Sequence, residues 1–261
     1  KVRRKGGHDM AEELYQQIAE RTNGDVYIGV VGPVRIGKST FVKRVMESLV
    51  IPNMTDEVDR LRAQDELPQS SPGAVIMTAE PKFVPAHGTS IQVGDDAFRF
   101  NIRLADCVGY IVEGAKGHED ENGPKLVHTP WHHDPIPFEE AARIGTDKVI
   151  RDHSTIGIVM TTDGSVNEIP RAAVEKVEEE IVGQLKEIGK PFVILLNCRF
   201  PDNDQTAHLR QELFKKYNVP VIAAAVDRMS VHEIQFVLKE ALYEFPVTTF
   251  ELLKPEWMDV L

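Results

Sequence analysis

The chain has 261 residues, of which 30 are Lys or Arg and 41 are Asp or Glu, so its formal net charge is −11. With 42% hydrophobic residues it is neither a disordered nor a collagen-like chain, and no window reaches the roughly 20 apolar residues of a membrane helix. Its acidity disfavours nucleic acid as a partner, because phosphate binding needs a basic surface. Cys107 and Cys198 lie far apart, which indicates a cytoplasmic protein without a disulfide framework or structural zinc.

The pattern along the chain suggests three parts. Residues 1–9 are basic, contain glycine and lack periodicity, which indicates the remnant of an expression tag. Because this segment carries four positive charges and one negative, residues 10–261 have a net charge of −14. Residues 10–245 are predicted to form one domain. Residues 246–261 do not complete a structural unit and are predicted to begin a connection to a further domain.

Apolar runs alternate with amphipathic runs, which is typical of an α/β domain with a mainly parallel sheet. Two stretches, 53–73 and 109–137, lack this pattern and are predicted to be functional loops or insertions. In chain order, we predict a helix over 11–22, a strand over 26–31, a helix over 38–50, a strand with one solvated face over 97–104, a strand over 155–161, a helix over 171–188, a strand over 192–196, a helix over 206–217, a strand over 219–225 and a helix over 231–243.

A GxxxxGK[ST] motif lies between the first predicted strand and the helix that follows it. Glycines in this motif let successive N–H groups point at phosphate oxygens, and the helix N-terminus adds its positive end. Lys38 would neutralise charge on the β- and γ-phosphates, and the Ser39 hydroxyl would bind Mg²⁺. The alternative is an accidental glycine-rich turn. The predicted nucleotide-binding residues of the motif are Gly32, Pro33, Val34, Arg35, Ile36, Gly37, Lys38, Ser39 and Thr40.

A DxxG sequence, Asp106 to Gly109, follows the strand over 97–104. In GTPase-like proteins, such an Asp lies near Mg²⁺ and the Gly N–H meets the γ-phosphate. Thr78 lies between the two motifs, where this class offers a switch threonine to Mg²⁺ and the γ-phosphate. The alternative for Thr78 is an ordinary turn residue. The predicted catalytic residues are therefore Lys38, Thr78 and Asp106, with Ser39, Thr78 and Asp106 as Mg²⁺ ligands.

Two positions depart from the GTPase pattern. After the strand over 192–196, an NKxD motif would select guanine, but the sequence reads Asn197-Cys198-Arg199-Phe200. Without the lysine that packs on the base and the aspartate that reads guanine, the site loses its discrimination against adenine, so ATP is the predicted nucleotide. Asn197 is kept as a nucleotide-binding residue. Tyr110 stands where many GTPases have a water-orienting glutamine.

Other chemistry-bearing residues are predicted to have ordinary roles. Arg35 is expected to point outward. His128, His132 and His133 lie in a proline-rich loop without the spacing of a metal site. Glu178–Glu180 is interpreted as a solvated helix face.

Beyond these motifs, the chain resembles the stage IV sporulation protein A family, the spore-coat morphogenetic ATPases of endospore-forming bacteria. The resemblance covers residues 12–261, and family members often have Thr in place of Ile36 and Ala79. By this comparison, Thr78 is the sole switch hydroxyl here. The segments that carry the resemblance are Asp25–Arg35, Arg62–Ser70, Glu80–Pro85, Asp106–Tyr110, Gly114–Gly117, Glu119–Pro124, His153–Gly157 and Ala241–Val247.

The resemblance implies a three-layer α/β P-loop fold of the GTPase-like TRAFAC type, with one antiparallel strand. It also implies that ATP hydrolysis with Mg²⁺ drives self-assembly into a polymer, the basement layer of the spore coat. The implied location is the mother-cell cytoplasm, at the forespore outer surface. Implied partners are other coat morphogenetic proteins and a membrane-associated protein, reached through domains outside this chain. Two alternatives stay open: a GTPase-like switch that does not polymerise, and a structural module with little turnover.

Overall fold

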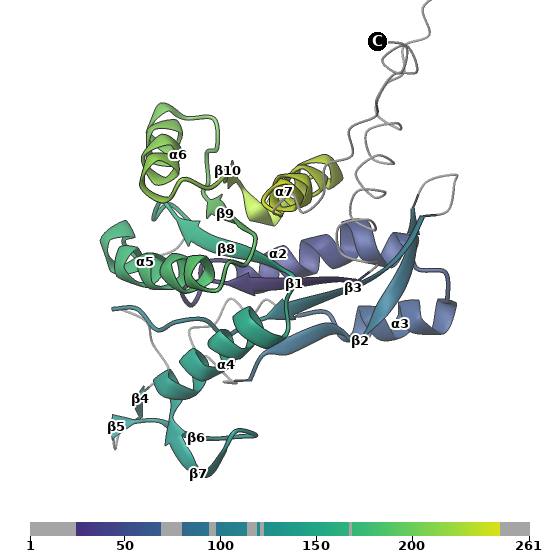
Figure 1. The fold of residues 1–261 in the computed structure, drawn as a ribbon, viewed down its shortest axis with the longest axis horizontal. Coiled ribbons are helices and arrows are strands. Elements are labelled where there is room, and N and C mark those ends of the chain that lie inside the picture. Colours follow the sequence, from purple (N-terminus) through teal and green to yellow (C-terminus); the bar gives the residue numbers. More distant parts are fainter. Residues whose placement is uncertain are drawn as a thin grey trace, which may run out of the picture.

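Six strands form a central sheet in the computed structural model, and helices cover both of its faces (Figure 1). The strand order is β10-β9-β8-β1-β3-β2, and all neighbours are parallel except β2 and β3. This confirms the predicted mixed α/β architecture with a mainly parallel sheet. The strands are β1 (Asp25–Val31), β2 (Lys82–Val93), β3 (Phe98–Asp106), β8 (Ile156–Thr162), β9 (Phe192–Asn197) and β10 (Val221–Ala224).

The structure describes residues 25–68, 80–93, 98–113, 119–120, 123–166 and 169–245. The segments 1–9 and 246–261, the predicted helix over 11–22, and Thr78 lie outside these residues. The domain boundaries therefore stay predictions. Within the described ranges, no helix is both long and apolar enough to cross a membrane.

Helices form two outer layers. α4, α5 and α6 pack on one face of the sheet, and α2 and α7 pack on the other (Figure 1). α3 contacts the edge strand β2. The helices are α2 (Lys38–Val45), which continues as a π-helical turn (Met46–Val50) and a 3₁₀ turn (Ile51–Asn53), α3 (Glu57–Asp65), α4 (Phe138–Asp152), α5 (Arg171–Glu187), α6 (Asp204–Tyr217) and α7 (Val231–Tyr243).

The apolar runs in the sequence become the central strands. β8 and β9 are buried along their full length, as expected for strands covered by helices on both faces. In β1, Ile28 and Val30 contribute to the core beside α2 and α7, whereas Val31 contributes to the core beside α4, α5 and α6. Because five strands are parallel, their carboxyl ends meet at one edge of the sheet, where α/β proteins place their ligands.

One predicted loop contains a helix. Within the stretch 53–73, α3 begins after Asp56, whose carboxylate accepts hydrogen bonds from the N–H groups of Val58 and Asp59. Hydrophobic periodicity does not indicate this helix, because Ala63 is its only buried residue, and Val58 and Leu61 are exposed. The Asp cap and the long helix-forming side chains, rather than an apolar stripe, explain why it forms.

The second predicted loop, 109–137, contains two small hairpins. They are formed by β4 (Glu119–Asp120) with β5 (Gly123–Pro124), and by β6 (Leu126–Thr129) with β7 (His132–Pro137). His128, His132 and His133 are exposed on the second hairpin. This hairpin leads into α4, a helix that we did not predict. α4 buries Phe138, Ala141 and Val149, among others.

The interpretation of Glu178–Glu180 as a solvated face is wrong for Glu178. Its side chain is fully buried between β8, α5 and α6. The Arg171 guanidinium donates two hydrogen bonds to the carboxylate at 2.6 and 2.8 Å, and the hydroxyls of Thr161 and Tyr217 donate at 2.6 and 2.8 Å. Burial and the bond to Glu178 raise the pKa of the Tyr217 hydroxyl. A buried carboxylate is tolerated here because all of these donors converge on it.

This cluster leads to a stability prediction. Glu178→Gln keeps the shape but removes the buried counter-charge of Arg171, which keeps only the half-exposed Glu175 carboxylate at 3.8 Å, so the free energy of unfolding should fall by about 3 kcal/mol. Glu179→Gln is the matched control, since Glu179 pairs with Lys216 at 2.6 Å on the surface and surface pairs contribute little. Urea unfolding followed by circular dichroism measures both variants. Equal decreases in the free energy of unfolding for the two variants would show that the buried ion pair stabilises the protein no more than the surface pair does.

Candidate functional site

The loop between β1 and α2, residues 32–37, has an unusual backbone. Gly32 and Gly37 have φ values of 146° and 97°, and Arg35 has a φ of 62°. A Cβ atom on Gly32 would lie 2.4 Å from the Met160 carbonyl oxygen, and one on Gly37 would lie 2.6 Å from Asn197 Nδ2. Both glycines are therefore required by conformation and by space. We call this segment the β1–α2 loop.

α2 begins at Lys38, directly after this loop. Among the described side chains, none caps the helix start, and the first turn contains no acidic residue. The N-terminal N–H groups and the positive end of the helix dipole therefore remain available to an anion.

Lys38 is buried with 4% of its surface exposed, and its ammonium donates a hydrogen bond to the Pro33 carbonyl oxygen. Burial lowers the pKa of Lys38 to about 8, and the nearby Asp106 carboxylate opposes that shift. A charged ammonium in this position lacks most of its hydration. An anionic ligand placed beside it would be strongly attracted.

Asp106 ends β3 and lies close to Lys38 and Ser39. The Ser39 hydroxyl hydrogen-bonds its carboxylate, whose pKa is raised by burial. The atom Oδ1 of Asp106 is buried and has no hydrogen-bond partner among the described residues. A hard cation prefers oxygen ligands of this kind. The pair formed by Ser39 and Asp106 therefore fits a magnesium ion.

Gly109 and Tyr110 run beside the β1–α2 loop. The Tyr110 N–H donates to the Gly32 carbonyl at 3.2 Å, and the Val34 N–H donates to the Tyr110 carbonyl at 2.9 Å. Gly109 has a φ of 93°, and a Cβ there would lie 2.4 Å from Lys38 Nζ. The Tyr110 hydroxyl donates at 2.8 Å to Gln184 on α5. This side chain is thus engaged with α5.

Asn197 connects the β1–α2 loop to the chain after β10. Its Nδ2 donates to the Ile36 carbonyl at 2.9 Å, and its Oδ1 accepts from the Val226 N–H at 3.2 Å. Both bonds are buried. These bonds hold the end of β9 against the β1–α2 loop. Asn197 therefore lies beside the other predicted nucleotide-binding residues.

A cavity of about 300 Å³ lies beside the loop at the carboxyl ends of β9 and β10. Sequence reasoning missed four of its residues: Val166, Arg199, Asp227 and Arg228. The signal that points to Asp227 is its position in the turn that follows β10, at the edge where parallel strands present ligand-binding residues. Phe200, by contrast, is 59% exposed and does not line the cavity. The lining residues are Arg35, Ile36, Gly37, Thr40, Val166, Asn197, Arg199, Asp227 and Arg228.

The structure thus brings together residues 32–40, Asp106, Gly109 and Asn197. Arg35 is exposed and also lines the cavity. Thr78 is the predicted site residue that lies outside the described residues, so its role stays a prediction. Lys82, which follows it in the chain, pairs with Asp106 across the β2–β3 ladder.

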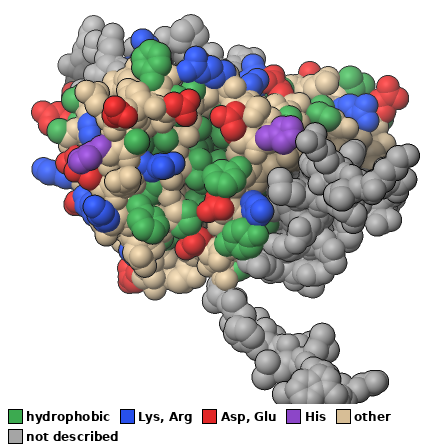
Figure 2. All heavy atoms as spheres, turned by 90° about the horizontal axis from the view of Figure 1, so that it is seen from above, with side chains coloured by type: hydrophobic (Ala, Val, Ile, Leu, Met, Phe, Trp, Pro, Cys, Tyr) green, Lys and Arg blue, Asp and Glu red, His purple; other side chains and the backbone are tan. Residues whose placement is uncertain are grey.

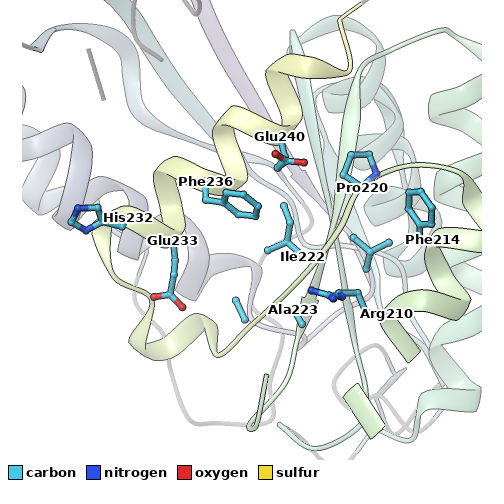
Figure 3. Close-up of a pocket in the computed structure, with 11 residues that line it drawn as sticks. Arg210, Phe214, Pro220, Ile222, Ala223, His232, Glu233, Phe236 and Glu240 are labelled. Atoms are coloured by element: carbon cyan, nitrogen blue, oxygen red, sulfur yellow. The ribbon is translucent and has the colours of Figure 1, made fainter. Parts of the chain in front are cut away.

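A second cavity, of about 540 Å³, lies at the β10 edge of the sheet between α6 and α7 (Figure 3). Phe214 and Phe236 lie on opposite sides of Ile222 in this cavity, and both phenylalanines are half exposed. Figure 2 shows hydrophobic side chains among charges of both signs on the face seen from above. None of the predicted site residues lines this cavity.

Comparison with known proteins supports the family resemblance. Residues 10–246 match the family described as stage IV sporulation protein A, ATPase domain. Stage IV sporulation protein A of Bacillus anthracis is 55% identical over 249 residues, that of Bacillus subtilis (strain 168) is 54% identical over 249, and that of Clostridioides difficile (strain 630) is 50% identical over 252. These alignments cover 95%, 95% and 97% of this chain, which spans about half the length of each relative. The chain therefore belongs to the stage IV sporulation protein A family, and residues 10–246 correspond to the ATPase domain of that family.

Proposed function

We propose that residues 10–245 form a P-loop ATPase of the GTPase-like TRAFAC type that hydrolyses ATP with Mg²⁺. The observation that carries this proposal is the convergence of four groups at one edge of the sheet. They are the buried ammonium of Lys38, the hydroxyl of Ser39, the carboxylate of Asp106 and the backbone at Gly109. Together they match what a triphosphate with a divalent cation requires.

In this proposal, the β1–α2 loop is the P-loop. Its N–H groups and the start of α2 bind the phosphates, and Lys38 lies beside the β- and γ-phosphates. Ser39, Asp106 and, from the sequence, Thr78 hold the Mg²⁺ ion. When bound, the ion neutralises charge on the phosphate oxygens. The Gly109 N–H meets the γ-phosphate end, where charge develops during hydrolysis.

The base of the nucleotide would lie in the cavity lined by Asn197 and Thr40. Two features favour ATP over GTP. The side chain at the position of the guanine-reading aspartate, Phe200, is outside the cavity, and Cys198, at the lysine position, is fully buried. The match to a family ATPase domain also supports ATP.

We further propose that turnover is coupled to self-assembly of the longer protein into the basement layer of the spore coat. The family resemblance supports this, as do relatives named for sporulation. The proposed location is the mother-cell cytoplasm at the forespore outer surface, with coat proteins and a membrane-associated protein as partners. The competing function is a GTPase-like switch without polymer formation.

The first test of the proposal is Lys38→Ala, which removes the buried ammonium. ATP binding and turnover should each fall by about 100-fold or more, because Lys38 is the buried cation at the start of α2 and lies beside Asp106. Lys43→Ala is the matched control, since Lys43 is on the same helix and pairs with Glu47 at the surface. The rates of ATP and GTP hydrolysis should be measured, and light scattering, which reports assembly, should be recorded on the same samples.

The expected result is faster ATP than GTP hydrolysis by the unaltered chain, with scattering that rises during turnover and no rise for Lys38→Ala. Wild-type binding by a folded Lys38→Ala chain would refute the P-loop assignment. A strong preference for GTP without a rise in scattering would favour the switch.

A second prediction concerns the cation. Asp106→Asn keeps the size of the side chain but removes the charge that attracts Mg²⁺. Titration of the unaltered chain with Mg²⁺ should increase its affinity for ATP, and the same titration of Asp106→Asn should change it little. Asp65→Asn, on α3, provides a control for the substitution itself. An equal Mg²⁺ response in all three chains would contradict the assignment of Asp106.

The third prediction separates binding from hydrolysis. Thr78→Ala should lower turnover by about 100-fold but leave the affinity for a non-hydrolysable ATP analogue nearly unchanged, because Thr78 would act at the γ-phosphate end in the transition state. Equilibrium binding and single-turnover hydrolysis measure the two effects. If Thr78→Ala loses affinity as completely as Lys38→Ala, the proposed role of Thr78 is wrong.

A further inference from the structure

The cavity beside the β1–α2 loop contains one carboxylate among its described lining residues, that of Asp227. Asp227 lies in the 3₁₀ turn Val226–Arg228, directly after β10. Both neighbours in this turn are held in place. The Val226 N–H donates to Asn197 Oδ1 at 3.2 Å, and the Arg228 N–H donates to the Ala225 carbonyl at 3.0 Å. The backbone that carries the Asp227 carboxylate is therefore well anchored.

Two neutral donors next to Asp227 are already engaged. The Val226 N–H binds Asn197, and the Asn197 amide donates to the Ile36 carbonyl at 2.9 Å. The 6-oxo group of guanine needs a donor, whereas the 6-amino group of adenine needs an acceptor. An ionised carboxylate accepts hydrogen bonds and offers none, so a carboxylate that faces position 6 of the base accepts from the adenine amino group and repels the guanine oxygen.

An arginine stacked on the base does not distinguish the two purines. Arg199 is anchored through its backbone, whose N–H donates to Ser165 Oγ at 2.9 Å and whose carbonyl accepts from the Arg228 guanidinium. Arg199 itself lines the cavity. A guanidinium that donates in the plane of the base favours guanine, because it can bind O6 and N7 together, whereas a guanidinium stacked on the ring contacts a face that both purines share.

We propose that Asp227 selects adenine by accepting a hydrogen bond from its 6-amino group, while Arg199 stacks on the purine ring. This inference rests on the proposed ATP binding at the β1–α2 loop. It places base selection on the turn after β10, away from Phe200, which stands at the position of the guanine-reading aspartate of GTPases but lies outside the cavity.

The test compares nucleotides that differ only at the base. MgATP, MgGTP and Mg–purine riboside triphosphate, which is ATP without the 6-amino group, compete with a fluorescent ATP analogue for the whole chain. The unaltered chain should bind ATP at least about 10-fold more tightly than the other two, as expected for a hydrogen bond to a charged acceptor. This measurement needs no variant, so it holds even where a substitution disturbs folding.

Variants then assign the effect to residues. Asp227→Asn introduces a donor, so the preference for ATP over GTP should fall about 10-fold. Arg199→Ala should weaken all three nucleotides by the same factor. Asp202→Asn, an exposed acid in the turn after β9 that does not line the cavity, should leave the preference unchanged.

The outcomes separate this inference from the function on which it rests. If the unaltered chain binds no triphosphate, the proposed function fails and base selection fails with it. If ATP binds but the analogue without the 6-amino group binds equally well, or if Asp227→Asn keeps the full preference for ATP, Asp227 does not read the base and the ATPase proposal stands.

Discussion

The burial of the Lys38 ammonium is the constraint around which this edge of the sheet is built. Removing a charged group from water costs several kcal/mol, and protein contacts must offset most of that cost. The Pro33 carbonyl and the Asp106 carboxylate do so only in part, because the pKa of Lys38 is still lowered to about 8. A polyanionic ligand would complete the compensation. The burial of this lysine therefore supports the proposal that the β1–α2 loop binds phosphate.

The β1–α2 loop that surrounds this lysine is fixed from two sides. On one side, the backbone of Tyr110 exchanges two hydrogen bonds with the loop, and on the other the Asn197 amide binds the Ile36 carbonyl. These contacts come from the segment that follows β3 and from the end of β9, the two strands that flank β1 and β8 in the sheet. N–H groups held in this way need little reorganisation when charge develops on a ligand, which is the main source of electrostatic stabilisation in enzymes.

A second buried charge, that of Glu178, stabilises the carboxyl edge of the sheet farther from Lys38. The Thr161 hydroxyl, at the end of β8, hydrogen-bonds both members of the ion pair between Arg171 and Glu178 on α5. Because Tyr217 on α6 also donates to Glu178, the cluster fixes the end of β8 to α5 and α6. The chain that leaves β8 supplies Ser165, whose hydroxyl accepts the Arg199 N–H. Val166, the next residue, lines the cavity. Stability and site geometry are thus connected through one short segment.

Local patterns in the sequence are sufficient for most of the described strands and helices and for the glycine-rich loop between β1 and α2, but not for β2, α3 and α4. Apolar runs, glycines at positions of positive φ and the spacing from Gly32 to Ser39 are properties of neighbouring residues, so they are visible without the fold. The family resemblance identified the chain for the same reason. Helix α3 escaped prediction because its apolar side chains are exposed and a cap, rather than burial, defines its start.

Contacts between distant segments were decided only by the tertiary structure. Glu178 reads as a surface residue because it stands among other glutamates, and its burial depends on Arg171, Thr161 and Tyr217 from other turns and elements. Asp227 likewise reads as an ordinary turn residue until β9 and β10 pair and bring it beside Asn197 and the β1–α2 loop. The sequence gives the chemical type of each side chain. Its burial and its partners depend on the fold, because they arise only when the parallel strands align their carboxyl ends.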